Sequence, residues 1–183
     1  MDTPKTKLSE LVTVLASSLE KHVAVQRKDP RLNERCNDWI KHHGLGRKLD
    51  ANVTLTKQVA LNITLKTIIY EAVRDFYGLE KLSGSNIRKL RQLINQLYET
   101  SQIPVLSESL LDDLLGDQYF VIAPFLEQVH ESINEIRSVE SDVIGKIYEE
   151  IVLQEERRRL GQFWTPGHIS EFMVHWSIKD KKK

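Results

Sequence analysis

Apolar residues recur every three or four positions along most of this 183-residue chain, which is the spacing of amphipathic helices. The first stripe predicts a helix over about Lys5 to Gln26. Its members are Leu8, Leu11, Val12, Leu15, Ala16, Leu19 and Val23. Asp29-Pro30 ends this pattern and starts a short helix over about Arg31 to His42, which Gly44 then breaks.

The most apolar stripe lies further along the chain and predicts one long helix. Thr54 or Thr56 is expected to open this helix, and Gly78 to end it. Its stripe comprises Leu61, Leu65, Ile68, Ile69, Ala72, Val73 and Phe76, and it is widened by Ile63. Because so much of its surface is apolar, we expect this helix to be central and largely buried.

Two shorter helices are predicted next. Ser83 or Ser85 is expected to cap the first of them. Its core-facing residues would be Ile87, Leu90, Ile94 and Leu97. A connector that contains a proline follows, and Ser107 is then expected to start a short helix that ends near Gly116.

The run Tyr119-Phe120-Val121-Ile122 is the one stretch typical of a strand. Pro124 and the lack of a partner strand favour a turn into a helix reaching Ile136. Ser141 is expected to begin the next helix, with Val143, Ile144, Ile147, Tyr148, Ile151 and Val152 facing inward. Pro166 would begin a last helix, whose apolar side carries Ile169, Phe172, Met173 and Trp176.

The chain is therefore expected to be all-α with about seven helices. Residues 1–140 would form a helical N-terminal domain and residues 141–183 a further helical segment. A hydrophobic content of 40% and a charged content of 28% are typical of a soluble globular protein. No apolar run approaches the roughly 20 residues of a membrane span, and the polar N-terminus lacks the core of a signal peptide. Cys36 is the single cysteine, which excludes a disulfide framework and favours a cytoplasmic location.

The net charge is zero, but its distribution is uneven. Residues 21–48 carry eight Lys and Arg against three Asp and Glu, whereas residues 99–142 carry ten acids and one Arg. The basic stretch predicts phosphate contacts with DNA through Arg27, Lys28, Arg31, Arg35, Lys41, Arg47 and Lys48. Arg88, Lys89 and Arg91, on the outer face of the helix after Ser83, are expected to contribute in the same way. The alternative is that both groups are ordinary solvated helix faces.

A short segment near the C-terminus carries the most specific pattern, Arg159-Leu160-Gly161-Gln162-Phe163-Trp164-Thr165-Pro166. Gly161 suits the end of one helix, and Thr165 followed by Pro166 suits the start of another. Taken alone, this is a helix corner whose aromatic rings fill the core. The same turn also gathers backbone N–H groups, a hydroxyl and two aromatic faces, which together can hold an anionic group and a cation.

The wider string resembles the N-terminal region of N6-adenine DNA methyltransferases of restriction-modification systems, both type I modification subunits and fused restriction-modification enzymes. That family's pattern is roughly D-h-h-G-x-h-Y-E, then R-x-x-x-G-x-F/Y-Y-T-P-x-x-h-x-x-x-M, where h is apolar. Here it matches Asp142-Val143-Ile144-Gly145-Lys146-Ile147-Tyr148-Glu149, then Arg157 to Pro166, then Ile169 and Met173. The match covers about residues 141–177, whereas the apolar helix upstream fits the family only in character.

The resemblance implies that this turn helps to hold S-adenosylmethionine. Thr165 would offer its hydroxyl, and the helix beginning at Pro166 its N-terminal dipole, to the methionine carboxylate. Phe163 and Trp164 would line the cofactor pocket, with one ring near the sulfonium. Trp164 stands where the family usually has Tyr, so the aromatic face is kept and a phenol hydroxyl is lost. The implied reaction is methyl transfer to the N6 amino group of an adenine flipped out of the DNA stack.

The family's glycine-rich cofactor loop and its Asn/Asp-Pro-Pro-Tyr/Phe motif occur nowhere in the 183 residues. The resemblance therefore implies the helical N-terminal part of a larger prokaryotic enzyme, which precedes an α/β Rossmann-like catalytic domain and is inactive alone. Its expected partners are DNA and a specificity or restriction subunit, and exposed Phe172 and Trp176 would favour self-association. The alternative is a stand-alone helical module that binds protein or DNA without catalysis.

A metal site is the remaining possibility in the last helix. His168, Glu171 and His175 are three and four positions apart, which places them near one helical face. A solvated polar face opposite the apolar side is the simpler interpretation, because no fourth ligand is evident. We therefore expect no metal.

Overall fold

The computed structural model describes residues 4–44 and 50–138, together with Ile169 and Met173. Over these residues the chain forms six α-helices and three short 3-10 helices, with no strand. The all-α class predicted from the sequence is therefore confirmed. The helices expected after residue 140, and the domain boundary placed there, lie outside the described residues.

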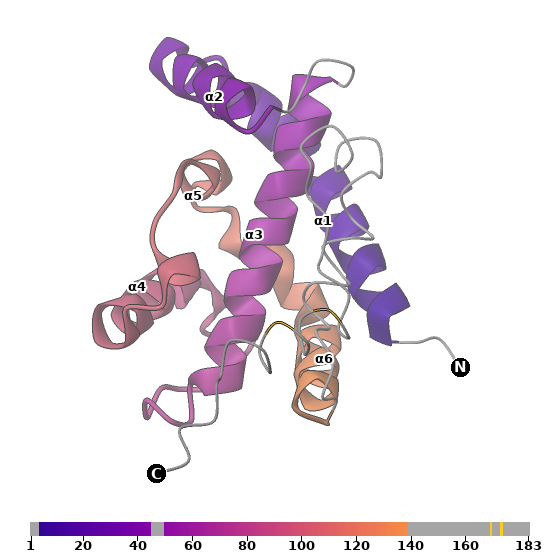
Figure 1. Cartoon of the computed structure of the whole chain (residues 1–183), viewed down its shortest axis with the longest axis vertical. Helices are drawn as coiled ribbons and strands as arrows, with labels where there is room; N and C mark the ends of the chain where they lie inside the picture. The colour runs from indigo at the N-terminus through magenta and orange to yellow at the C-terminus, as the bar shows by residue number, and fades with distance from the viewer. Residues whose placement is uncertain (1–3, 45–49, 139–168, 170–172, 174–183) are drawn as a thin grey trace.

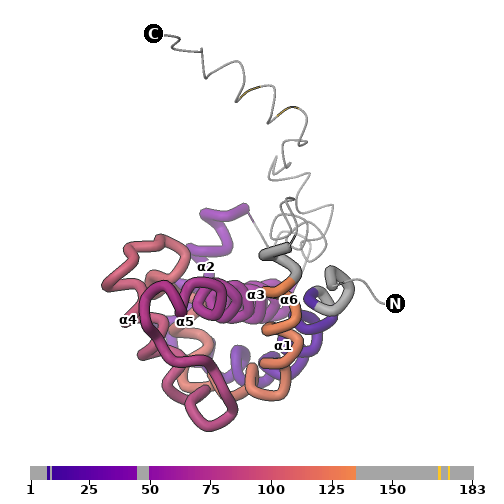
Figure 2. Tube along the Cα trace, turned by 90° about the horizontal axis from the view of Figure 1, so that it is seen from below, coloured from indigo at the N-terminus to yellow at the C-terminus, as the bar shows by residue number. Residues whose placement is uncertain are grey.

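Helix α3 (Ala51–Val73) runs through the middle of the molecule (Figure 1). It packs against α1 (Pro4–Gln26), α4 (Leu90–Ser101), α5 (Leu110–Leu115) and α6 (Leu126–Ser138). From below, α1 and α6 lie on one side of α3, and α4 and α5 lie on the other (Figure 2). Helix α2 (Pro30–His42) lies across the end of the molecule where α3 begins (Figure 1).

The sequence of α3 explains why it is central. Thirteen of its 23 residues are buried, as expected for a helix that is apolar on nearly every side. Two of its four buried threonines, Thr64 and Thr67, donate their hydroxyls to the carbonyls of Ala60 and Ile63, at 2.8 and 2.7 Å. The prediction of a central, largely buried helix is confirmed.

The ends of α3 differ from the prediction. The helix begins at Ala51 because the carboxylate of Asp50 accepts hydrogen bonds from the backbone N–H groups of Asn52 and Val53, at 2.7 and 3.3 Å. It ends at Val73, before a turn in which Gly78 adopts a left-handed φ of 66°. Phe76, expected in the buried stripe, is 86% exposed because it falls in that turn.

The helix after this turn confirms the predicted core face but not the predicted cap. It begins as η1 (Ile87–Lys89) and continues as α4, and its residues Ile87, Leu90, Ile94 and Leu97 are all buried. Neither Ser83 nor Ser85 caps it, since their hydroxyls lie 2.8 Å from each other. The carboxamide of Asn86 organises the turn instead, accepting from the N–H of Ser83 at 2.8 Å and donating to the carbonyl of Lys81 at 2.9 Å.

The described core is completed by η2 (Pro104–Leu106), α5, η3 (Gln118–Phe125) and α6. Helix α5 is preceded by Ser109 rather than starting at Ser107. The carboxylate of Asp112 explains this, because it accepts from the N–H and the hydroxyl of Ser109, at 2.8 and 2.7 Å. Gly116 ends α5 as expected. The run Tyr119–Ile122 lies in η3, which leads directly into α6, so the prediction of a turn rather than a strand is confirmed.

Crossing a membrane requires a helix that is both long and strongly hydrophobic. Within the described part of the chain, no helix combines the two to the degree that a bilayer crossing requires.

Candidate functional site

The predicted cofactor turn, Phe163, Trp164, Thr165 and Pro166, lies outside the described residues. Two positions of the same motif are described. Ile169 and Met173 are helical and expose 42% and 55% of their surface. The apolar side predicted for the last helix is therefore open to solvent at these two positions.

The metal-ligand candidates His168, Glu171 and His175 also lie outside the described residues. Among the residues whose side chains are described, no group of three or more His, Cys, Asp or Glu is arranged to hold a metal ion.

The predicted DNA-contacting residues occupy the start of the α4 segment. Arg88 and Lys89 lie in η1 and are exposed, whereas Arg91, in the first turn of α4, is partly buried. The Nε of Arg91 donates to Oε1 of Glu108 at 3.0 Å, and this hydrogen bond raises the pKa of Arg91. Hydrogen bonds from Asn95, at 2.9 Å, and from Arg91 in turn lower the pKa of Glu108.

Helix α5 joins this group to the basic stretch on α2. The Nη2 of Arg35 lies 2.9 Å from Oδ2 of Asp113, and the Nη2 of Arg91 lies 3.9 Å from Oδ1 of the same carboxylate. Arg35 and Arg91, from two basic segments far apart in the sequence, therefore face the same carboxylate on the side of the molecule where α2, α5 and α4 follow one another (Figure 1).

Other members of the basic stretch differ in their roles. Arg27 serves the fold, since its guanidinium donates to the side-chain oxygens of Asn33, Asn37 and Asn52 and so ties α2 to the start of α3. Lys28, Arg31 and Lys41 are exposed, and Arg47 and Lys48 lie outside the described residues.

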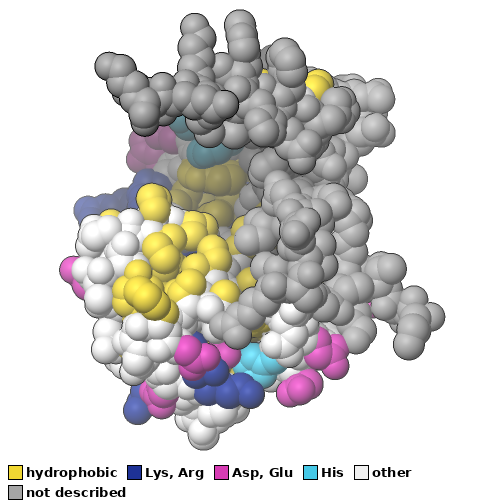
Figure 3. Space-filling model, turned by 60° about the horizontal axis from the view of Figure 1, so that its bottom comes forward, with side chains coloured by type: hydrophobic (Ala, Val, Ile, Leu, Met, Phe, Trp, Pro, Cys, Tyr) yellow, Lys and Arg dark blue, Asp and Glu magenta, His cyan; other side chains and the backbone are white. Residues whose placement is uncertain are grey.

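On the side formed by α2, α5 and α4, an anion is best able to bind a cation that is not already paired with a carboxylate. Arg35 and Arg91 already face Asp113 and Glu108. Arg88 and Lys89 form no ion pair with any described residue, so they are the better placed to meet a phosphate. On the face drawn in Figure 3, basic and acidic side chains are interleaved beside a patch of hydrophobic ones, so this view shows no extended basic surface.

A buried ion pair, which the sequence pattern did not reveal, joins α3 to α5. Lys66 and Asp112 are each 2% exposed, with Nζ 2.7 Å from Oδ2. The ammonium also donates to the carbonyl of Ser107 at 2.8 Å, and Asn62 donates to the other carboxylate oxygen at 3.2 Å. Because both groups are buried and hydrogen-bonded to other protein atoms, we interpret this ion pair as structural. The signal in the sequence was a lysine in the middle of the helix predicted to be largely buried.

A second buried carboxylate, Glu71, connects α3 to the loop that follows it and to α6. Its Oε1 accepts from the N–H of Leu82 at 2.7 Å and its Oε2 from Nε of Arg74 at 3.1 Å. His130 of α6 places Nε2 3.3 Å from Oε2, although it is not aligned for a hydrogen bond. Tyr70 donates its hydroxyl to the carbonyl of Glu80 at 2.8 Å in the same loop, and burial raises the pKa of Tyr70 to about 12.

Comparison with known proteins gives no assignment: no family model, curated protein or solved structure matches this chain at a significant level.

Proposed function

We propose that residues 1–183 form the helical N-terminal part of an N6-adenine-specific DNA methyltransferase of a restriction-modification system. The observation that carries this proposal is the motif Arg157 to Pro166, preceded by Asp142-Val143-Ile144-Gly145 and followed by Ile169 and Met173. Its glycine, paired aromatics and Thr-Pro step occur in the family's order and spacing. The all-α fold of the described residues is compatible with the helical arm of such an enzyme.

In this proposal the turn from Phe163 to Pro166 forms one wall of the cofactor pocket. S-adenosylmethionine supplies the methyl group as a sulfonium. Thr165 donates its hydroxyl to the methionine carboxylate, and the N–H groups at the start of the next helix add to the attraction. Phe163 and Trp164 cover the cofactor and exclude water. The catalytic residues that grip the flipped adenine belong to an α/β domain beyond these residues.

The helical domain has a different role in the proposal. It provides an arm that contacts DNA or a specificity or restriction subunit. The exposed cations Arg88 and Lys89 support DNA contact, because contacts to phosphate need charge and exposure but no base recognition.

The test uses the protein encoded by the complete reading frame that contains this chain. Thr165→Val and Trp164→Ala should each weaken binding of S-adenosylmethionine about tenfold, which corresponds to roughly 1.4 kcal/mol. Isothermal titration calorimetry measures the binding, and methyl transfer from labelled cofactor to DNA measures the activity. Trp164→Tyr should retain binding because it keeps the aromatic face.

Ser170→Ala serves as the control, since Ser170 lies beside the motif but occupies none of its defined positions. Cofactor binding that is unchanged in both Thr165→Val and Trp164→Ala would contradict the assigned roles. Residues 1–183 alone should transfer no methyl group to DNA, and measurable transfer would contradict the proposed division between arm and catalytic domain.

A further inference from the structure

The carboxylate of Asp113 faces two arginines that come from different helices. Its Oδ2 lies 2.9 Å from Nη2 of Arg35 on α2, and its Oδ1 lies 3.9 Å from Nη2 of Arg91 on α4. One carboxylate therefore directs one oxygen to each guanidinium. A phosphodiester also presents two anionic oxygens, and arginine binds carboxylates and phosphates through the same N–H donors. The position that Asp113 fills is therefore one that suits a phosphate.

The aspartate before it fixes where Asp113 lies. Asp112 is buried, and its carboxylate binds Lys66 and Asn62 of the central helix. These contacts hold α5 in place, and Asp113 is the next residue along that helix. Because its side chain is short and its helix is anchored, the Asp113 carboxylate is kept near the two guanidiniums at little cost in side-chain entropy.

The two arginines nevertheless remain open to an anion from solvent. The side chains of Arg35 and Asp113 are 57% and 37% exposed, and that of Arg91 is 33% exposed. Ion pairs this exposed contribute little to stability, so a phosphate can displace the carboxylate without a large penalty. Arg91 has a second acid, since its Nε donates to Glu108. Arg35 has no second acid among the described residues, so it is the cation that displacement of Asp113 frees.

We propose that Asp113 occupies a phosphate-binding position between Arg35 and Arg91 and masks it from DNA until the carboxylate is displaced. This inference rests on the proposed contact between the helical arm and DNA. Arg88 and Lys89 are exposed and pair with no described acid, so they are available for the first contacts. Once the duplex is held there, its phosphates compete with Asp113 at a high local concentration.

The test measures DNA binding by the complete protein as a function of salt concentration. Asp113→Asn keeps the shape of the side chain and removes the charge that competes with phosphate. It should tighten binding to a short duplex and steepen the slope of log K against log salt by about 0.9, the contribution of one phosphate. Fluorescence anisotropy measures both quantities. A slope equal to that of the wild type would overturn the proposal.

A second aspartate separates masking from a general gain of positive charge. Asp117→Asn removes the same charge four residues further along the chain. Asp117 is exposed and pairs with no cation among the described residues, so this substitution should leave the slope at the wild-type value. If Asp117→Asn steepened the slope as much as Asp113→Asn, the effect would be one of net charge and the proposal would be overturned.

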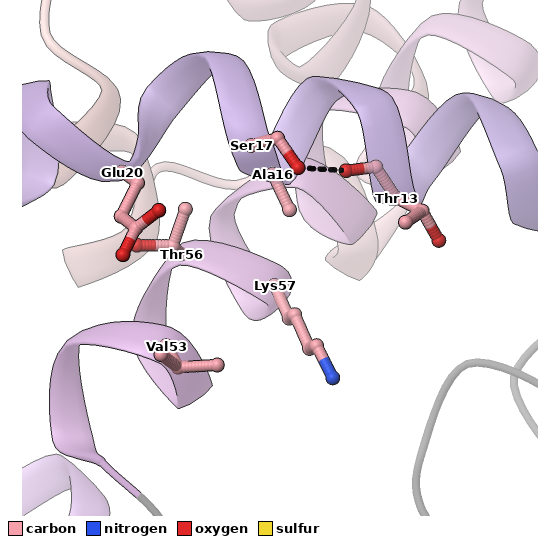
Figure 4. A pocket seen from close by; sticks show the side chains of 7 residues that line it. All are labelled: Thr13, Ala16, Ser17, Glu20, Val53, Thr56 and Lys57. Atoms are coloured by element: carbon pink, nitrogen blue, oxygen red, sulfur yellow. Dashed lines mark hydrogen bonds between the residues drawn. The ribbon is translucent and has the colours of Figure 1, made fainter.

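A double variant identifies the cation that is masked. Arg35→Ala should change the slope little in the wild type, but it should return the steeper slope of Asp113→Asn to the wild-type value. Lys57→Ala, combined with Asp113→Asn, should leave the steeper slope in place. Lys57 belongs to a different surface, where it lines a pocket of about 110 Å³ between α1 and α3 with Thr13 and Ala16 (Figure 4). An equal effect of Arg35→Ala with and without Asp113 would overturn the proposal.

Cofactor binding distinguishes a failure of this inference from a failure of the methyltransferase assignment. The substitutions at Asp113 and Arg35 should not alter binding of S-adenosylmethionine. If cofactor binding is as predicted and Asp113→Asn leaves the slope unchanged, masking alone is overturned. If the complete protein binds no S-adenosylmethionine but Asp113→Asn steepens the slope, masking is supported and the methyltransferase assignment is overturned. Thermal unfolding of each variant verifies that it is folded.

Discussion

At the residue scale, the buried contact between Lys66 and Asp112 is expected to have a large effect on stability. Both side chains are removed from water, so each depends on the other for the charge compensation that solvent would supply. Asp112 also accepts from Ser109 at the start of α5. One carboxylate thus joins the central helix to α5 and fixes where α5 begins.

Lys66→Met should lower the free energy of unfolding by about 3 kcal/mol, because it leaves a buried carboxylate without its cation. Urea denaturation followed by circular dichroism measures the change. Lys57→Met is the control: its lysine is on the same helix but only partly buried and without an ion pair in the described residues, so the change should be below about 1 kcal/mol. Equal losses in the two variants would show that the ion pair has no special role.

The same residues show why individual contacts could not be predicted from the sequence. The apolar stripe predicted the environment of Lys66 correctly, since it placed this part of the chain in a buried helix. Its partner is 46 residues away, on a short helix whose position relative to α3 depends on the whole core. A local pattern therefore reveals that a buried lysine needs a partner but not which acid provides it.

At the element scale, periodicity predicted the helices and their buried faces, whereas their ends depended on tertiary packing. Ile87, Leu90, Ile94 and Leu97 were expected to face the core and do so. Three helix starts were misplaced in the same way. Thr54 or Thr56 was predicted to open α3, whereas the helix is capped by Asp50, which that prediction did not consider. Asp50 caps α3 because of packing. Both threonines are buried inside the helix, and the hydrogen bond from Arg27 to Asn52 holds the turn that precedes them.

The start of α3 gives a direct test of this explanation. Asp50→Ala should destabilise the protein by about 1 kcal/mol, since it removes the side-chain acceptor for two N–H groups. Thr54→Val should be neutral or stabilising, because the buried Thr54 hydroxyl has no partner and valine keeps its shape. Thermal unfolding measures both. If Thr54 were the cap, the order of the two effects would be reversed.

At the scale of the whole molecule, charge pairing limits the proposed contact with DNA. The chain is neutral overall, and Asp113 of α5 and Glu108 of its preceding loop face Arg35 and Arg91. Composition revealed a basic stretch and an acidic one, but their pairing emerged only when the fold brought α2, α4 and α5 together. Any attraction to DNA should consequently be short-ranged and depend on a few exposed cations rather than on a broad field.

For the proposed methyltransferase, the salt dependence of DNA binding by the complete protein distinguishes those cations. Each phosphate contact contributes about 0.9 to the slope of log K against log salt. Arg88→Ala with Lys89→Ala should therefore reduce the slope by about 2, as measured by fluorescence anisotropy at several salt concentrations.

Arg91→Ala should change the slope much less, because its guanidinium is already bound to Glu108 and would have to leave that carboxylate to reach a phosphate. Lys57→Ala, which changes a lysine on α3 outside both basic groups, should leave the slope unchanged. A slope that is the same for the double variant and the wild type would remove η1 from the DNA interface and favour a subunit contact for this side of the molecule.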